Sequence, residues 1–505
     1  MQRRRRSPGR LGRAAALATA ALVAAGSCLA AAGSAVASAG EAGGAAGHDD
    51  PFASILFALA LVVSSALVGR WAAARLGMAS VVGELAVGVV VGNALYQLGS
   101  PLALVLMHSG TVNEVVRDAW LSGRSIAEAA AHVMGAAQLA PGTQGARVVG
   151  LLAGPEGPRL FMLMTALWIF SSFGVILLLF MVGLESTVEG MLKVGARAGA
   201  VAAVGIAAPF ALGYATSSWL LPEASGTAHL FYAATLTATS VGITARVFKD
   251  VGLLQSLEAR VILGAAVIDD VLGLVILAIA VAIAETGRVD PAAIARITAL
   301  SALFLGALLL VGERLARRGA RLFAALERGQ VKLLMPLVFA FLMAWAASEI
   351  GLAAIVGAFG AGLVLREQLF EGIGGEERTL HEILAPFEAI FAPIFFVLMG
   401  MQVDLATFAH PATLALGGAF VVAAILGKLV AGLAAGAGSD RLSVGIGMVP
   451  RGEVGLIFAS IGKGLGVIDD AAFSAVVLMV MTTTLVAPLG LGWSLRRGRA
   501  AAAAS

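Results

Sequence analysis

Long apolar blocks recur along the whole chain and limit what it can fold into. Each block runs for roughly 17–25 residues, the length of helix that crosses a hydrocarbon core about 30 Å thick. Hydrophobic residues make up 59% of the 505 residues and charged residues only 13%, whereas a soluble domain carries about a quarter charged residues. So few charges cannot cover a water-soluble surface, and the 63 glycines suit close approach of helices in lipid. The sequence therefore predicts an all-α polytopic membrane protein.

About thirteen membrane helices are predicted. Their approximate cores are 53–69, 79–98, 161–183, 198–221, 228–247, 258–284, 292–312, 331–349, 352–366, 385–402, 412–436, 442–462 and 471–494. Cytoplasmic loops of membrane proteins are enriched in lysine and arginine. If the first span starts outside, the inner loops hold most of the basic residues that lie between spans, including Arg70, Arg75, Lys193, Arg197, Lys249, Arg260, Arg314, Arg317, Arg318, Arg321, Arg366, Arg441, Arg496 and Arg497. We therefore expect a bacterial inner membrane protein whose mature N-terminus is outside and whose C-terminus is cytoplasmic.

The N-terminus has the composition of a secretory signal. Basic residues from Arg3 to Arg6 precede an alanine-rich apolar run, and small residues around Ala37 offer a cleavage site. We expect a signal peptide over 1–39, an external segment over 40–52, a transmembrane domain over 53–494 and a cytoplasmic tail over 495–505. The alternative is a first membrane helix that is never removed.

Within the transmembrane domain, residues 100–159 form an external insert. Ser125 and Glu128 have the spacing of a helix capping box, so we expect one or two short helices there, lying on the outer surface.

Several functional classes are excluded by composition. Cys28 is the single cysteine and the six histidines are scattered, so no cofactor is predicted and no metal other than a transported ion. Basic residues lie between apolar blocks rather than in one patch, which argues against nucleic acid binding. No glycine-rich dinucleotide motif follows a strand, so we expect no nucleotide-binding domain on this chain.

Two adjacent carboxylates, Asp269 and Asp270, lie in the middle of the predicted span 258–284. A charge at the centre of a bilayer costs roughly 2.5–3.5 kcal/mol on insertion scales, so a pair is difficult to explain as packing. Neighbouring helical positions differ by about 100° in direction, and the two side chains can therefore face different partners. Close carboxylates resist simultaneous ionisation. Such a pair can hold protons, or release them to hold a cation.

Two spans contain signals for a broken helix. Hydroxyl residues crowd the middle of span 228–247, among them Thr239 and Ser240, and Pro450 interrupts span 442–462 next to Arg451 and Glu453. Broken helices in corresponding halves of a transporter indicate a binding site near the bilayer midplane, between inverted repeats. We take the repeats as roughly 79–284 and 352–494, and expect their broken helices to cross at that site.

Other charges within or near the spans are candidates for the same site. Lys428 lies inside a span and needs a counter-ion, for which Asp269 or Asp270 is the candidate. Arg451 and Glu453 are predicted to be a gating or structural charge pair. Glu84 and Glu349 are weaker candidates for lining a cavity or for bonding between helices.

These segments together resemble the cation:proton antiporter-2 superfamily of bacterial exchangers, and its sodium/proton antiporters of the electrogenic Asp-Asp type. The motifs that carry the resemblance are Val82-Gly-Glu-Leu85, Leu179-Phe-Met-Val-Gly-Leu-Glu185, Thr239-Ser-Val-Gly242, Val267-Ile-Asp-Asp-Val271, Gly357-Ala-Phe-Gly-Ala-Gly362, Pro393-Ile-Phe-Phe-Val397 and Pro450-Arg-Gly-Glu453. They cover nearly the whole chain from residue 53. The external insert and the signal-like N-terminus depart from the pattern.

The resemblance implies a homodimer in which each protomer has a dimerisation domain and an ion-translocation core. It implies that Asp270 is the ion-binding carboxylate, that Asp269 accompanies electrogenic exchange, and that Lys428 pairs with this site. Thr239, Ser240 and Pro450 fall where the family's helices are interrupted.

We therefore expect a secondary transporter rather than an enzyme, one that moves Na⁺ or Li⁺ out and H⁺ in and serves pH homeostasis. The alternatives are potassium/proton exchange or potassium efflux, an intramembrane aspartyl protease, and a non-transporting sensor. The protease is disfavoured because its two aspartates must converge from different helices.

Overall fold

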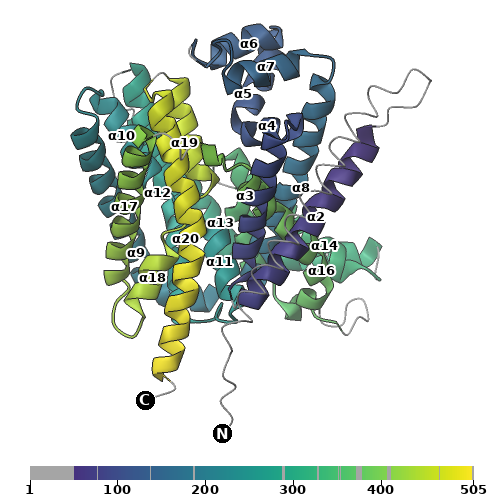
Figure 1. Cartoon of the computed structure of the whole chain (residues 1–505). Helices are drawn as coiled ribbons and strands as arrows, with labels where there is room; N and C mark the ends of the chain where they lie inside the picture. Colours follow the sequence, from purple (N-terminus) through teal and green to yellow (C-terminus); the bar gives the residue numbers. More distant parts are fainter. Residues whose placement is uncertain are drawn as a thin grey trace, which may run out of the picture. The chain divides into compact units, whose positions relative to one another are not determined.

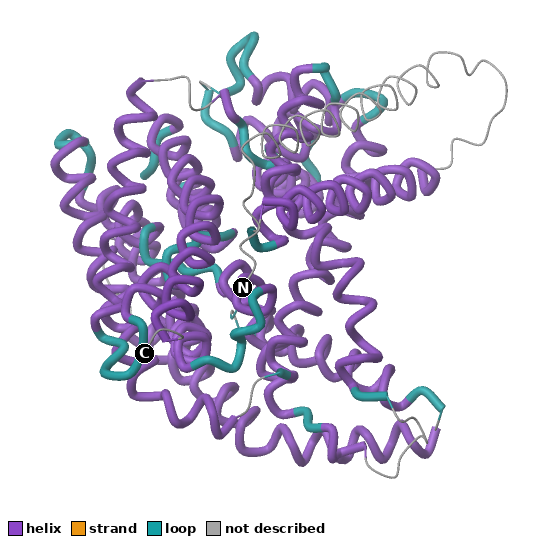
Figure 2. Tube along the Cα trace, turned by 60° about the horizontal axis from the view of Figure 1, so that its bottom comes forward, coloured by secondary structure: helices purple, strands orange, loops and turns teal. Residues whose placement is uncertain are grey.

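The computed structural model describes residues 51–76, 78–136, 138–185, 188–286, 291–326, 329–350, 352, 354–370, 378–406, 411–465 and 467–502. Every regular element in these ranges is helical, and no strand occurs among them (Figure 2). The predicted all-α class is confirmed. The expected signal peptide over 1–39 and most of the external segment that follows lie outside the described residues.

Ten helices in the described part are long and apolar enough to cross a membrane. They are α2 (Pro51–Leu76), α3 (Ser80–Gln97), α8 (Gly157–Leu184), α9 (Val188–Leu220), α12 (Leu257–Thr286), α13 (Pro291–Leu326), α14 (Val331–Glu349), α16 (Leu380–Met401), α17 (Pro411–Leu433) and α20 (Asp470–Ala502). The other three expected spans coincide with shorter helices, which are α15 (Ala354–Val364) and the pairs α10 (Gly226–Thr235) with α11 (Val241–Asp250) and α18 (Arg441–Gly447) with α19 (Glu453–Gly464). Each of these two pairs is one expected span, broken in its middle.

The chain divides into two compact units. The first extends to Ser172 and includes Pro393–Leu405. It contains α2, α3, the first half of α8 and the end of α16 (Figure 1). Helices α2 and α3 pack closely because both lack side chains at one crossing point, where a Cβ added to Gly83 would lie 1.9 Å from the carbonyl oxygen of Gly69. Asn93 on α3 donates to the carbonyl of Val403 at 2.6 Å and so fixes the segment that follows α16.

The insert over residues 100–159, in the first unit, is more helical than predicted. It folds into α4 (Pro101–Met107), α5 (Ser109–Ser122), α6 (Ile126–Val133) and α7 (Gln144–Ala153), so the expectation of one or two short helices was wrong. The predicted capping box is confirmed, since the Ser125 hydroxyl accepts from the Glu128 amide and the Glu128 carboxylate accepts from the Ser125 amide. Ser100 and Thr143 cap α4 and α7 with a single bond each, in which the hydroxyl accepts from the amide of Ala103 or of Ala146. These caps stabilise helices too short to show a clear apolar period.

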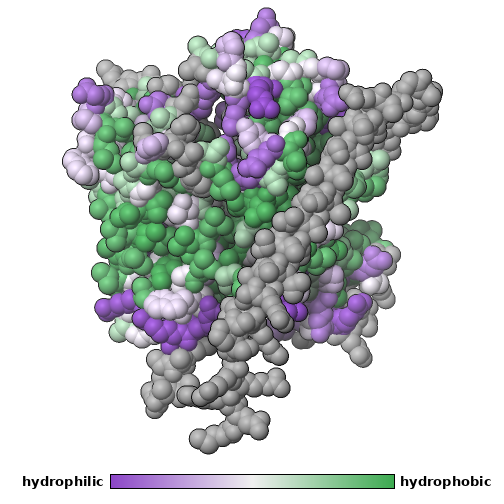
Figure 3. Space-filling model, viewed as in Figure 1, coloured by the Kyte–Doolittle hydropathy of each residue, from purple (hydrophilic) through white to green (hydrophobic). Residues whose placement is uncertain are grey.

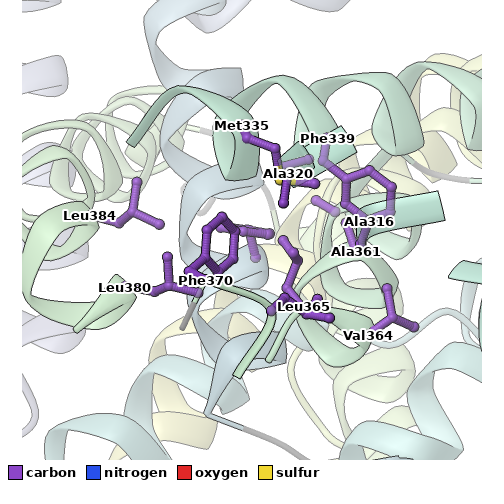
Figure 4. Close-up of a cluster of buried hydrophobic side chains, with 14 of the residues drawn as sticks. Ala316, Ala320, Met335, Phe339, Ala361, Val364, Leu365, Phe370, Leu380 and Leu384 are labelled. Carbon is purple, nitrogen blue, oxygen red and sulfur yellow. The ribbon is translucent and has the colours of Figure 1, made fainter. Parts of the chain in front are cut away.

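The second unit comprises residues 173–392 and 406–505. One of its apolar clusters joins α13, α14, α15, the short 3-10 helix Glu367–Phe370 and α16. Figure 4 shows Met335, Phe339, Phe370 and Leu380 gathered in this cluster. A second cluster includes Tyr232 on α10 and Phe420 on α17, whose rings lie 5.7 Å apart. On α9 and α17, hydrophobic residues cover the middle of the helices and hydrophilic residues gather near their ends (Figure 3). This distribution is the one expected of helices that cross a bilayer.

Candidate functional site

Both helix breaks have a local cause in the sequence. Between α10 and α11 the helix stops after Thr235, and the hydroxyls of Thr235 and Thr237 donate to the carbonyls of Tyr232 and Ala234 at 2.7 and 2.8 Å. Such bonds offer the backbone an alternative to continuing the helix. Between α18 and α19, Pro450 has no N–H to donate and cannot extend the ladder.

The two breaks lie against each other although more than two hundred residues separate them. The Ser240 amide donates to the Pro450 carbonyl at 2.8 Å, and the Thr244 hydroxyl donates to the Gly447 carbonyl at 2.6 Å. Gly452 makes room for this approach, because an added Cβ would lie 2.9 Å from the Ser240 hydroxyl oxygen. The backbone groups freed by one break are therefore partly satisfied by the other.

Arg451 bridges the breaks with a positive charge. Its side chain is fully buried, and its Nη1 donates to the Thr237 carbonyl at 3.0 Å and to the Ala238 carbonyl. These carbonyls follow the C-terminal end of α10, where a helix carries partial negative charge. Among the described residues, Nε and Nη2 of Arg451 have no hydrogen-bond partner. The guanidinium is thus held at one nitrogen, and its other donors face the interior.

Asp269 forms a buried ion pair with Lys428. The Lys428 ammonium lies 2.8 Å from Asp269 Oδ2, and the two side chains are 0% and 1% exposed. The Thr239 hydroxyl donates to the same oxygen at 2.7 Å. Helices α12 and α17 and the first break therefore meet at one carboxylate oxygen. The other oxygen, Oδ1, is buried and has no hydrogen-bond partner in the described part of the chain.

Asp270 faces different surroundings from its neighbour. Its exposed fraction is 9%, and it lines a cavity of about 10 Å³ whose other lining residues are Leu179, Val241, Leu263, Val267, Ile355, Val356 and Phe359. A volume of this size holds about one water molecule. The other residues that line this small chamber are all apolar, whereas Asp269 makes an ion pair and a hydrogen bond. The 100° offset between adjacent helical positions accounts for the difference.

The remaining predicted residues lie elsewhere. Glu84 belongs to the first unit, where it is buried and pairs with Arg70 at 2.5 Å. Glu349 is exposed and is the last residue of α14. The side chain of Glu453, at the start of α19, lies outside the described residues. Of the predicted set, the structure thus brings together Asp269, Lys428 and Thr239, with Ser240 and Arg451 at the contact between the breaks.

A second charged cluster was missed by the sequence reasoning. Glu388 on α16 is buried, and its carboxylate lies 2.6 Å from the Lys249 ammonium and 3.3 Å from Arg246 Nη1. Both cations belong to the last two turns of α11, and Lys249 also lies 3.3 Å from Glu185. A lone acid inside the predicted span 385–402 was the available signal. Its partners could not be read from the sequence because they come from a distant half-helix.

Known proteins match this chain over most of its length. Residues 126–497 match the family described as sodium/hydrogen exchanger, transmembrane. The high-affinity Na⁺/H⁺ antiporter NhaS3 of Synechocystis is 33% identical over 447 residues, which cover 86% of this chain and 88% of that protein. The Na⁺/H⁺-K⁺ antiporter GerN of Bacillus cereus is 32% identical over 358 residues, which cover 69% of this chain and 88% of that protein.

A solved structure also shares the fold. The sodium proton antiporter MjNhaP1 of Methanocaldococcus jannaschii superposes with a TM-score of 0.52 at 13% identity, over 87% of this chain and 99% of that one. At this identity the match supports the fold alone. The family match, which covers well over half of the 505 residues, confirms the resemblance read from the motifs. This chain is therefore a multi-pass membrane protein of the sodium/hydrogen exchanger family.

Proposed function

We propose that this protein exchanges Na⁺ or Li⁺ for protons by alternating access, that Asp270 is the carboxylate that binds the transported ion, and that the Asp269–Lys428 pair couples the two fluxes. The observation that carries this proposal is the buried Asp269–Lys428 pair, which lies next to Asp270 and against the first helix break. It agrees with the cation and proton exchange for which the relatives are named.

The chamber of Asp270 accounts for alternate binding of a proton and a cation. Ionisation of a carboxylate at an apolar cavity wall inside a membrane is costly, so the site favours a bound proton or a bound cation. Space for about one water requires a cation to leave most of its hydration shell behind. The Asp270 carboxylate and the unpartnered Oδ1 of the adjacent Asp269 are the oxygen donors that replace it.

The buried pair accounts for coupling. A cation that is bound by Asp270 and also reaches Asp269 competes with the Lys428 ammonium for the Asp269 carboxylate. An unpaired ammonium inside the protein costs several kcal/mol, so Lys428 gives up its proton when the cation takes its place. When the ion pair forms again, Lys428 takes up a proton and the cation is released. With one proton carried by Asp270 and one by Lys428, each cation is exchanged for two protons, and one net charge moves inward per cycle.

Potassium is the second candidate ion, because the name of the relative GerN includes K⁺.

Assembly and location follow the pattern expected from the sequence. We propose a homodimer in the bacterial inner membrane, a cleaved signal peptide over 1–39, a mature N-terminus outside and a cytoplasmic C-terminus.

The test is an exchange assay in proteoliposomes that contain a pH-sensitive dye. Addition of Na⁺, Li⁺ or K⁺ to the wild-type protein should change the internal pH, and Asp270→Asn should abolish the change. Asp118→Asn is the matched control, because it makes the same substitution on the insert helix α5, where Asp118 pairs with Arg124. If Asp270→Asn exchanges ions at the control rate, the site assignment is wrong. If the wild-type protein shows no cation-dependent proton flux, the proposed exchange itself is wrong.

A further inference from the structure

A cavity of about 550 Å³ lies in the first unit, between the insert helices and the start of α8. Its size is typical of sites for small organic ligands. Helix α8 contributes a single stripe of residues at three- and four-residue spacing, namely Pro158, Phe161, Met162, Thr165, Ala166 and Ile169. From Pro158 to Ile169 the helix rises about 16 Å. The stripe therefore spans about half of a 30 Å hydrocarbon core, the thickness of one leaflet.

The lining excludes ions as ligands. The insert contributes Val116, Trp120, Ile126 and Leu152, and the polar side-chain atoms of the lining are the Trp120 ring nitrogen and the Thr165 hydroxyl. The Thr165 oxygen is buried without a hydrogen-bond partner in the described residues. Hydrocarbon fills such a space favourably, at about 25 cal/mol per Å² of apolar surface removed from water.

The insert side of the cavity has the composition of a membrane interface. Trp120 and Leu121 on the insert helix α5 are 74% and 80% exposed. Arg117 is also exposed, and it lies one turn before them on the same face of α5. Tryptophan beside a basic residue is typical of the level of lipid headgroups. The Trp120 ring meets Phe161 edge-on, with centroids 5.5 Å apart, so this interfacial face continues directly into the cavity.

The α8 side of the cavity is continuous with the lipid-contacting surface. Helix α8 is one of the membrane spans, and Met162, Trp168 and Ile169 on it are exposed. Met162 and Ile169 also line the cavity. A hydrocarbon chain in the adjacent leaflet therefore reaches the cavity along α8 without crossing water.

We propose that this cavity binds one acyl chain of a membrane phospholipid from the leaflet on the side of the insert, with the headgroup at the level of Arg117 and Trp120. The lipid fastens the insert to the start of α8. This proposal uses the transmembrane fold and the cavity, and it is independent of the ion chemistry proposed above.

The test places the full chain in phosphatidylglycerol vesicles whose acyl chains carry bromine near their middle. Bromine quenches tryptophan fluorescence on contact, and the difference between wild type and Trp120→Phe isolates the Trp120 signal. The expected result is that brominated chains quench Trp120 more strongly than aqueous iodide does. Ala166→Phe, which fills the cavity from α8, should remove most of this quenching. Val90→Phe is the matched control, because Val90 is an exposed residue of the span α3 and should leave the quenching unchanged.

Native mass spectrometry of the detergent-purified protein provides the second measurement. The wild type and Val90→Phe should retain a bound phospholipid that Ala166→Phe loses, and the smaller Ala166→Leu should give an intermediate loss. Three results overturn the proposal. They are stronger quenching of Trp120 by iodide, equal lipid retention and quenching in Ala166→Phe and wild type, and conversion of a dimer to a monomer by Ala166→Phe, which would show that a second copy covers the cavity.

Discussion

Removing one charge of the Asp269–Lys428 pair should destabilise the protein far more than removing both. The ammonium and the carboxylate are 2.8 Å apart and almost completely buried. Breaking a buried pair by removing one partner costs about 3–5 kcal/mol, because the other charge is left uncompensated, whereas replacing both partners with neutral groups is often nearly neutral. Lys428→Met and Asp269→Asn should each show the large loss, and the double variant should recover most of it.

The assay is thermal unfolding of the detergent-purified protein at a fixed scan rate, since unfolding of large membrane proteins is often irreversible. The unfolding midpoint of the double variant should be close to that of the wild type. Both midpoints should be well above those of the two single variants. Lys193→Met is the control for loss of a lysine, because Lys193 is exposed on α9. If the double variant loses the sum of the two single losses, the charges do not stabilise each other and the ion-pair argument fails.

Three further results are expected. Gly452→Ala should slow exchange, because its Cβ would lie 2.9 Å from the Ser240 hydroxyl, whereas Gly418→Ala has open space and should exchange at the wild-type rate in the same liposome assay. A membrane potential of 100 mV, negative inside, should raise the steady-state cation gradient about 50-fold, because one net charge per cycle is worth about 2.3 kcal/mol; an unchanged gradient would show electroneutral exchange. Ser125→Ala should cost about 1 kcal/mol of local stability in α6, measured by amide hydrogen exchange. The Ser125 amide donates to the Glu128 carboxylate and lowers the pKa of Glu128 below its usual 4.5. The ionised Glu128 side chain therefore stabilises α6 fully above pH 4.5, and this stabilisation is lost as the pH falls through the lowered pKa.

Much of the fold followed from patterns that act over short distances. Apolar block lengths located the spans, and Pro450 and the hydroxyls near Thr239 located both breaks. The insert was harder, because its short helices depend on caps rather than on a long apolar period. At the site, Asp269 and Asp270 were equal candidates for Lys428 in the sequence. Only the rotation of α12 against α17 decides between them, and this rotation depends on side chains from distant parts of the chain.

The Glu388 cluster is a second case in which contacts between distant parts of the chain could not be predicted from the sequence. A lone acid in a span can be noticed, but the charge pattern assigned Lys249 to an inner loop, and Arg246 lies near the end of the predicted span 228–247.

The unpartnered Oδ1 of Asp269 has a kinetic consequence under the proposed function. Both Lys428 and Thr239 occupy Oδ2, so an arriving cation can approach Oδ1 while the ammonium is still in place. Exchange of the ammonium for the cation at the Asp269 carboxylate is then associative, which means that the entering cation binds before the leaving ammonium departs. The alternative order would expose an uncompensated carboxylate in a medium of low dielectric constant, at a cost of several kcal/mol. An associative order removes that barrier, and it makes leakage of protons in the absence of a cation intrinsically slow.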